Sequence, residues 1–325
     1  MPLRLMAAGK TDTGLQREQN EDAFYAQVID DAHPASGVFI VSDGMGGYHA
    51  GEVASQLAVE TIRDDLMALF TQTSDQTTVP LNNRRGRKGS KSGKRDGAKT
   101  KPLSEVDNEA AAPIESASAE ATESDDLTVD DVSDANATRH LLETVVQRHY
   151  SEKLRIAVEH SSQAIEDYGV EHREARGMGA TATVALVMSG HAFIANVGDS
   201  RTYLLRDGKL ERVTRDHSLV ARLVEAGQIE PDDVYDHPSR NLIYRSLGAG
   251  HAEVEVDIFE EKLRAGDTLL LCCDGLWEMI RDPQIKKILT THADVEEACE
   301  MLIQVANENG GEDNITAVLV RCVEA

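Results

Sequence analysis

The most informative stretch of the chain is residues 38–47, VFIVSDGMGG, where apolar and β-branched residues lead into an aspartate and a glycine-rich turn. The run is too short for a helix and is stopped by glycine, so it predicts a buried strand. A carboxylate at the end of such a strand needs a cation or hydrogen bonds to compensate its burial. Glycine lets the backbone approach a ligand closely, so the carbonyl of Gly44 is a candidate metal ligand. Taken alone, an Asp-Gly pair more often marks an ordinary turn.

The composition narrows the classes of function. The chain has 325 residues, 41% of them hydrophobic, and a formal net charge of −24. Such a surface repels nucleic acid and anionic membranes, so we expect neither as a partner. The four cysteines form no Cys-x-x-Cys pair, and no signal peptide or membrane-spanning run is recognisable. These features predict a soluble protein in the reducing cytoplasm.

Apolar periodicity predicts a mixed chain with many short strands. A polar loop is expected at residues 9–14, and the polar segment 215–248 is expected to form an exposed flap beside the site. Helices are predicted at residues 51–70, 139–168, 218–226 and 295–307. Strands are predicted at residues 4–8, 22–28, 180–188, 191–197, 202–206, 209–213, 254–259, 267–273 and 315–320.

One segment departs from this pattern. Residues 71–138 have almost no apolar periodicity, with a basic part around residues 84–101 and an acidic part at 105–134. Such a segment cannot bury enough surface to offset the entropy of ordering. We therefore expect a single domain, residues 1–325, interrupted by a disordered insertion at 71–138. A tolerated surface insertion is favoured over a tail that docks on the domain or on a partner.

Acidic residues recur where apolar strands begin or end. Like charges gathered at strand ends are most easily explained if they converge on divalent cations. Oxygen ligands without His or Cys indicate Mg²⁺ or Mn²⁺ and not Zn²⁺. Two such ions can activate a water for attack on phosphorus, and Arg17 would then hold the phosphate oxygens. The acids are Asp22, Asp43, Asp199, Asp274 and Asp313.

The ordered set of motifs resembles the bacterial metal-dependent Ser/Thr protein phosphatases of the PP2C (PPM) class. The resemblance implies an α+β fold, an α-β-β-α sandwich of two antiparallel sheets flanked by helices. It covers residues 5–320 apart from the insertion. The matching motifs are Arg17-x-x-Asn20-Glu21-Asp22, Asp43-Gly44-Met45-Gly46-Gly47, Gly177-x-Gly179-Ala180-Thr181, Gly198-Asp199-Ser200-Arg201, Asp274-Gly275-Leu276-Trp277 and Asp313-Asn314-Ile315-Thr316.

The resemblance also implies roles for the residues of a catalytic centre with two or three metal ions. Asp43 is expected to bridge two ions and the Gly44 carbonyl to bind one of them. Asp274 and Asp313 are expected to hold the other ion, and Arg17 the substrate phosphate.

Further acids are assigned by the same resemblance. Glu21 and Asp22 are expected to act on the first ion, directly or through its water. Asp199 is expected to bind a third ion, with help from Glu278.

Four polar or sulfur-containing positions complete the expected site. Asn20 and Asn314 are expected to brace the carboxylates without contacting metal. Met45 stands where many eukaryotic members have a histidine proposed as general acid, and methionine cannot donate a proton. His49 could partly substitute, although a surface role is favoured for it.

The expected activity is hydrolysis of phosphoserine and phosphothreonine in proteins by a metal-bound hydroxide, without a phosphoenzyme. Expected partners are phosphorylated substrates of a bacterial Ser/Thr kinase, and the chain is expected to be a monomer. One alternative is a non-catalytic phosphoprotein-binding scaffold. Another is a phosphatase of phosphorylated anti-sigma antagonist proteins.

Overall fold

The computed structural model describes residues 3–29, 35–47, 50–71, 135–250 and 253–325. Contacts divide the chain into two units, Met1–Asp75 with Leu141–Ala325, and Gln76–His140. The first unit carries the fold described below. Of the predicted insertion, residues 72–134 lie outside the described residues, whereas residues 135–138 already belong to a helix.

The described strands form a five-stranded and a seven-stranded sheet, and every pairing is antiparallel. The first sheet has the order β1 (Leu3–Asp12), β12 (Ile315–Glu324), β11 (Thr268–Cys272), β7 (Arg201–Arg206) and β8 (Lys209–Arg212). The second has the order β10 (Asp257–Lys262), β6 (His191–Val197), β5 (Ala182–Met188), β3 (Ser36–Met45), β4 (Gly179–Ala180) and β9 (Leu247–Gly248), with β2 (Asp22–Ile29) also paired to β3.

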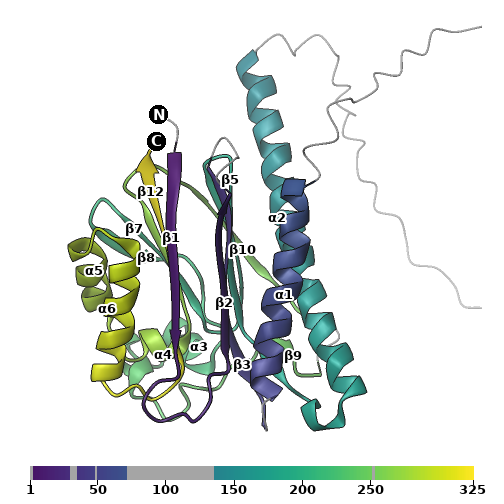
Figure 1. Ribbon diagram of the computed structural model, residues 1–325, viewed down its shortest axis with the longest axis vertical. Coiled ribbons are helices and arrows are strands. Elements are labelled where there is room, and N and C mark those ends of the chain that lie inside the picture. Colours follow the sequence, from purple (N-terminus) through teal and green to yellow (C-terminus); the bar gives the residue numbers. More distant parts are fainter. Residues whose placement is uncertain (1–2, 30–34, 48–49, 72–134, 251–252) are drawn as a thin grey trace, which may run out of the picture. The chain divides into compact units, whose positions relative to one another are not determined.

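Helices cover the outer faces of both sheets (Figure 1). The second sheet is covered by α1 (Ala50–Thr71) and α2 (Ala135–Glu171), and the first by α5 (Asp282–Thr291) and α6 (Val295–Glu308). Shorter elements are η3 (Arg173–Ala175), α3 (Leu219–Glu225), η4 (Pro231–Tyr235) and α4 (Asp274–Trp277). This arrangement confirms the predicted α-β-β-α sandwich.

The position of β3 in the sandwich explains why residues 38–41 are all apolar. Val38 and Ile40 pack toward α1 and α2, whereas Phe39 and Val41 pack between the two sheets. Successive side chains of a strand point to opposite faces, and both faces of β3 are covered. All four side chains are therefore fully buried.

The predicted element boundaries were wrong at several places. Strand β1 runs on to Asp12, because Asp12 still pairs with Ile315, so the first part of the expected loop is strand. Likewise β3 continues through Gly44, which pairs with Ala180. Strand β10 spans Asp257–Lys262, later than predicted, and α5 was not predicted at all.

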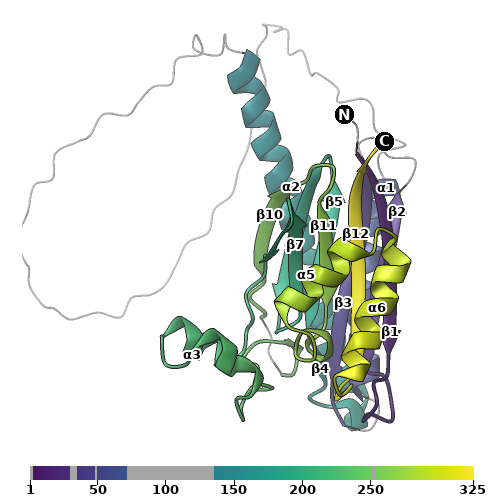
Figure 2. The same cartoon turned by 90° about the vertical axis from the view of Figure 1, so that its left-hand side faces the viewer.

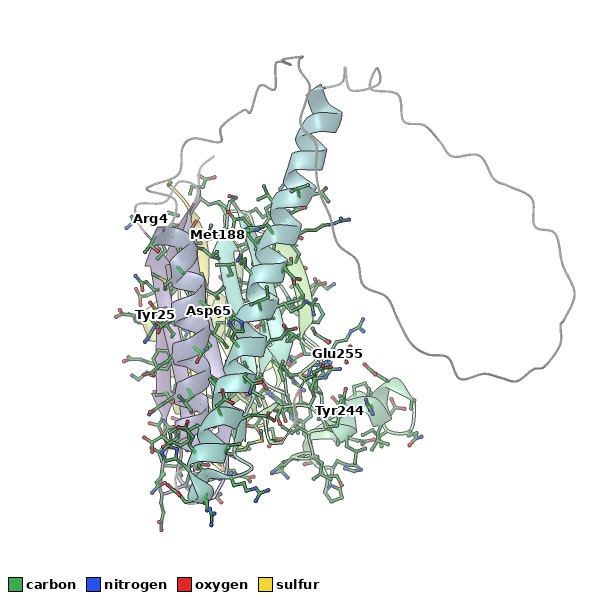
Figure 3. The ribbon with its side chains drawn as sticks, turned by 90° about the vertical axis from the view of Figure 1, so that its right-hand side faces the viewer. Arg4, Tyr25, Asp65, Met188, Tyr244 and Glu255 are labelled. Atoms are coloured by element: carbon green, nitrogen blue, oxygen red, sulfur yellow. The ribbon has the colours of Figure 1, made fainter. Side chains whose placement is uncertain are left out.

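Helix α3 lies where the sequence predicts it, with Ser218 as its N-cap. Figure 2 shows α3 away from the two sheets. Arg222 of α3 stacks on the ring of Tyr244, 3.7 Å from its centroid, and Figure 3 labels Tyr244 beside this helix. The middle of the segment 215–248 is mostly exposed, as predicted, whereas Asp216, His217 and Ser218 near its start are buried and Leu247–Gly248 at its end form β9.

Helices α1 and α2 lie side by side, and Asp65 of α1 accepts a 2.7 Å hydrogen bond from His160 of α2 (Figure 3). In the parts of the chain that the structure describes, neither of these helices nor any other is apolar over a length that could cross a bilayer.

Candidate functional site

Five acids that the sequence places at strand ends gather at one end of the sandwich. Asp22 is the first residue of β2 and stands opposite Asp43 in the register of β2 and β3. Asp43 lies within electrostatic reach of Asp22, Asp199 and Asp274, and Asp274 interacts with Asp313. The structure thus brings together residues that are up to 291 positions apart in the sequence, from Asp22 to Asp313.

Gly44 permits a close approach of three backbone segments. A Cβ atom at Gly44 would lie 2.0 Å from the carbonyl oxygen of Gly51 and 2.6 Å from that of Glu21. A Cβ atom at Gly51 would lie 2.7 Å from Glu21 Oε1 and 2.8 Å from the carbonyl oxygen of Gly44. The Glu21 carboxylate and the Gly44 carbonyl therefore both pack against Gly51 and lie close to each other.

Gly275 lets the segments that carry Asp274 and Asp313 approach each other closely. A Cβ atom at Gly275 would lie 2.1 Å from the carbonyl oxygen of Asn314 and 3.2 Å from Cβ of Asp313. No residue with a side chain fits between these backbones. Asp274, at the start of α4, is therefore held beside the turn that carries Asp313.

The two asparagines predicted to brace the acids hydrogen-bond to the backbone around them. Asn314 Oδ1 accepts from Glu21 N at 2.8 Å, and its Nδ2 donates to the carbonyl oxygen of Gln19 at 2.8 Å. Asn20 Oδ1 accepts from Asp22 N at 3.1 Å. These contacts fix the Glu21-Asp22 segment against the Asp313 turn, which supports a bracing role.

Burial and like charge raise the pKa of the clustered acids. Burial is the main cause of a pKa of about 7 for Asp22, and a 2.6 Å hydrogen bond from Thr316 Oγ1 works against it. Burial, followed by the charge of Asp274, raises the pKa of Asp43 and of Asp199 well above the ordinary range. The pKa of Asp274 is raised by burial and by the neighbouring charge of Asp313.

These carboxyl groups fit a divalent cation. Asp22 Oδ1 and Asp274 Oδ1 are buried and have no hydrogen-bond partner among the described residues. Leaving acceptors unpaired is costly, and a cation would both bind these oxygens and cancel the repulsion between the acids.

The cluster does not form a closed cage. Within the described ranges, no three His, Cys, Asp or Glu side chains are arranged to hold one metal ion. A structural zinc site requires such a closed set of ligands. Magnesium instead keeps several waters and takes one or two carboxylates, so a hydrated hard cation suits this site better.

Arg17 lies at the exposed side of the cluster. Its side chain is 48% exposed, and Nη2 donates to Asp313 Oδ2 at 2.6 Å. The guanidinium is thus placed where an incoming anion could reach it while one edge contacts the acids.

Glu278 and Asp199 lie within electrostatic reach of each other, and both interact with Asp274. Their charges interact, and burial raises the pKa of Glu278 to about 7. The indole Nε1 of Trp277 donates to the carbonyl oxygen of Asp199 at 3.0 Å.

Arg240 is a site residue that sequence reasoning missed. Its Nε donates to Glu278 Oε2 at 3.0 Å, and its Nη2 donates to Glu312 Oε2 at 2.9 Å. The residue lies in the polar segment 215–248, which has no periodicity that could single it out. Met45 ends β3 opposite Gly179, whereas His49 lies outside the described residues.

Comparison with known proteins agrees with this geometry. A family profile described as protein phosphatase 2C matches residues 15–320. The chain belongs to the protein phosphatase 2C family. A relative named serine/threonine phosphatase stp, from Listeria monocytogenes serotype 4b, is 31% identical over 311 residues, which are 96% of this chain and 93% of that protein.

A second relative is the serine/threonine protein phosphatase PstP of Mycobacterium tuberculosis, 30% identical over 99% of this chain and 46% of that protein. A crystal structure of the M. tuberculosis phosphatase PstP/Ppp superimposes with a TM-score of 0.66 at 30% identity, covering 99% of both chains. Another, the PstP catalytic domain in complex with two manganese ions, has a TM-score of 0.64 at 28% identity and covers 99% of this chain and 100% of that one. The carboxylate cluster described above therefore belongs to a protein phosphatase 2C fold.

Proposed function

We propose that the chain is a metal-dependent phosphatase that hydrolyses phosphoserine and phosphothreonine in proteins. The observation that carries the proposal is the cluster of Asp22, Asp43, Asp274 and Asp313, in which two buried carboxylate oxygens have no hydrogen-bond partner among the described residues. Family membership and the names of the relatives support the same activity.

In this proposal Mn²⁺ or Mg²⁺ binds at two or three positions. Asp43 would hold metal together with the Gly44 carbonyl on one side and with Asp274 and Asp313 on the other. Glu21 and Asp22 would act on the first ion directly or through its water. Asp199, with help from Glu278, would hold a third ion. When bound, the ions lower the pKa of a water and polarise the phosphoryl group.

The protein's own residues position the substrate and disfavour a covalent route. Arg17, at the exposed side of the cluster, binds the phosphate oxygens of the substrate. Cys273 lies near Asp22 and Asp274, and burial together with these charges raises the pKa of its thiol well above the ordinary range. A thiol that stays protonated is a poor nucleophile, which argues against a phosphoenzyme formed on Cys273.

The test is release of phosphate from a phosphothreonine peptide with Mn²⁺ and with EDTA. We expect Mn²⁺-dependent release that Asp43→Asn abolishes, and much slower release from a phosphotyrosine peptide. Tight binding of phosphoprotein without hydrolysis at saturating Mn²⁺ would instead favour a phosphoprotein-binding scaffold.

The finer predictions concern the physiological setting. Substrates of a bacterial Ser/Thr kinase are the proposed partners, and a screen that includes phosphorylated anti-sigma antagonist proteins separates the two substrate classes. The monomeric state, the cytoplasmic location and the single domain interrupted at residues 71–138 stay predictions.

A further inference from the structure

Thr181 binds both backbone polar groups of Asp43. The residue lies between β4 and β5 and is 1% exposed. Its N donates to the carbonyl oxygen of Asp43 at 2.8 Å, and its Oγ1 accepts from Asp43 N at 3.0 Å. The backbone N and the carbonyl oxygen of Asp43 are therefore both held by this one residue.

The same hydroxyl also contacts the turn that carries Asp199. Thr181 Oγ1 lies 2.7 Å from Ser200 Oγ, and Ser200 is fully buried next to Asp199 in the chain. The methyl group of Thr181 packs on the turn as well, because a Cβ atom at Gly198 would lie 2.6 Å from Thr181 Cγ2. One side chain thus links two segments that each carry an acid of the cluster.

This link matters because the two acids repel each other. Asp43 and Asp199 lie within electrostatic reach; Asp199 is buried and Asp43 is partly buried. Without a fixed backbone, repulsion would separate their carboxylates and reduce the precision of a shared cation site. Trp277 and His217 also hold the turn, through the Asp199 carbonyl and through Gly198, but within the described residues neither forms a hydrogen bond with Asp43.

We propose that Thr181 is a positioning residue that sets the separation of Asp43 and Asp199 and thereby the affinity of the site for divalent cations. This inference rests on the metal centre of the proposed function. It assigns Thr181 no contact with substrate or metal, since the residue acts through the backbone of Asp43 and through Ser200.

The chain offers a matched control. Thr183 Oγ1 lies 2.7 Å from Thr202 Oγ1, so this pair joins β5 to β7, two residues after Thr181 and Ser200 in each segment. Both pairs are buried hydroxyl–hydroxyl contacts. Replacing Thr183 by Val therefore removes a hydrogen bond of the same kind without touching Asp43.

The experiment measures Mn²⁺ binding to the full chain by calorimetry and by the electron paramagnetic resonance signal of free Mn²⁺. The variants are Thr181→Val, Thr181→Ser and Thr183→Val, with thermal unfolding in EDTA as a measure of folding. We expect Thr181→Val to weaken Mn²⁺ binding by about 10- to 100-fold. Thr181→Ser keeps the hydroxyl and should stay within about threefold of the wild type, as should Thr183→Val, by the same reasoning.

A further variant covers the case in which Thr181→Val does not fold. Ser200→Ala removes only the contact to the Asp199 turn. We expect it to weaken the binding of the lower-affinity Mn²⁺ ions and to leave the higher-affinity binding unchanged. Equal Mn²⁺ affinities of Thr181→Val and Thr183→Val, or unchanged binding by Ser200→Ala where Thr181→Val cannot be folded, would overturn the assignment. A wild-type chain that binds no Mn²⁺ would refute the metal centre itself, and Thr181 would lose its role with it.

Discussion

Replacing Asp22 by Asn should stabilise the metal-free protein at alkaline pH. Burial moves the pKa of Asp22 from 3.8 to about 7 in the folded chain. The folded state therefore holds this proton more tightly than the unfolded state does. The contribution of protonated Asp22 to the free energy of unfolding is complete below about pH 4 and is lost as the pH rises through about 7.

The magnitude follows from the size of the shift. About three pKa units at about 1.4 kcal/mol each correspond to about 4 kcal/mol in total. About 2 kcal/mol of this is lost between about pH 5.5 and about pH 8, and the rest at lower pH. The neighbouring acids titrate in the same range, so the comparison between wild type and variant isolates the share of Asp22.

The assay measures the free energy of unfolding by guanidinium in EDTA, at about pH 5.5 and at about pH 8. The wild type should lose about 2 kcal/mol more than Asp22→Asn on going from the acidic to the alkaline buffer. Asp64→Asn, which removes the same charge from a 70% exposed side chain, is the control and should follow the wild type. If Asp22→Asn and the wild type lose the same stability, the reasoning from burial is refuted.

Three further outcomes are expected. Gly275→Ala places a Cβ 2.1 Å from the carbonyl oxygen of Asn314, so it should cost about 1–3 kcal/mol in unfolding experiments and weaken Mn²⁺ binding; wild-type values of both would contradict the contact. Trp277→Phe leaves the buried carbonyl of Asp199 without its indole donor and should cost about 1–3 kcal/mol in guanidinium unfolding; wild-type stability of this variant would contradict a role for the contact. Mn²⁺ at about 100 times its Kd should stabilise the wild type by about 2.7 kcal/mol in thermal unfolding, reversibly with EDTA, and a chain indifferent to Mn²⁺ would exclude the site.

The sequence allowed the layers and most of the acids to be predicted, because both depend on local patterns. The run 38–41 is apolar on both faces, which a strand covered on both sides requires. Each clustered aspartate lies next to such a run, so its approximate place followed from the strand itself. The ends of β1 and β3 were not predictable in this way, since pairing with β12 and β4 extends them through polar and glycine residues.

Contacts between side chains from distant segments were beyond the reach of sequence patterns. Arg240 meets Glu278 and Glu312, and a bridge between Ser218 and Ile243 closes the part of the polar segment that carries it. That segment has no periodicity from which its course could be inferred. The hydroxyl of Thr181 likewise belongs to a recognisable motif, but only the fold shows that it joins the two acid-bearing segments.

The carboxylates of the cluster repel one another, and the packing of the backbone around them keeps them close together. Without a cation, buried like charges raise each other's pKa, and Asp22 Oδ1 and Asp274 Oδ1 have no hydrogen-bond partner in the described part of the chain. The backbone around them cannot relax easily, because Gly44, Gly275 and Asn314 pack without room for adjustment. A cation therefore gains binding energy by relieving a repulsion that folding has already imposed, which is the form that preorganisation takes in this site. Substitutions that loosen the backbone contacts should then weaken metal binding even where every carboxylate is retained.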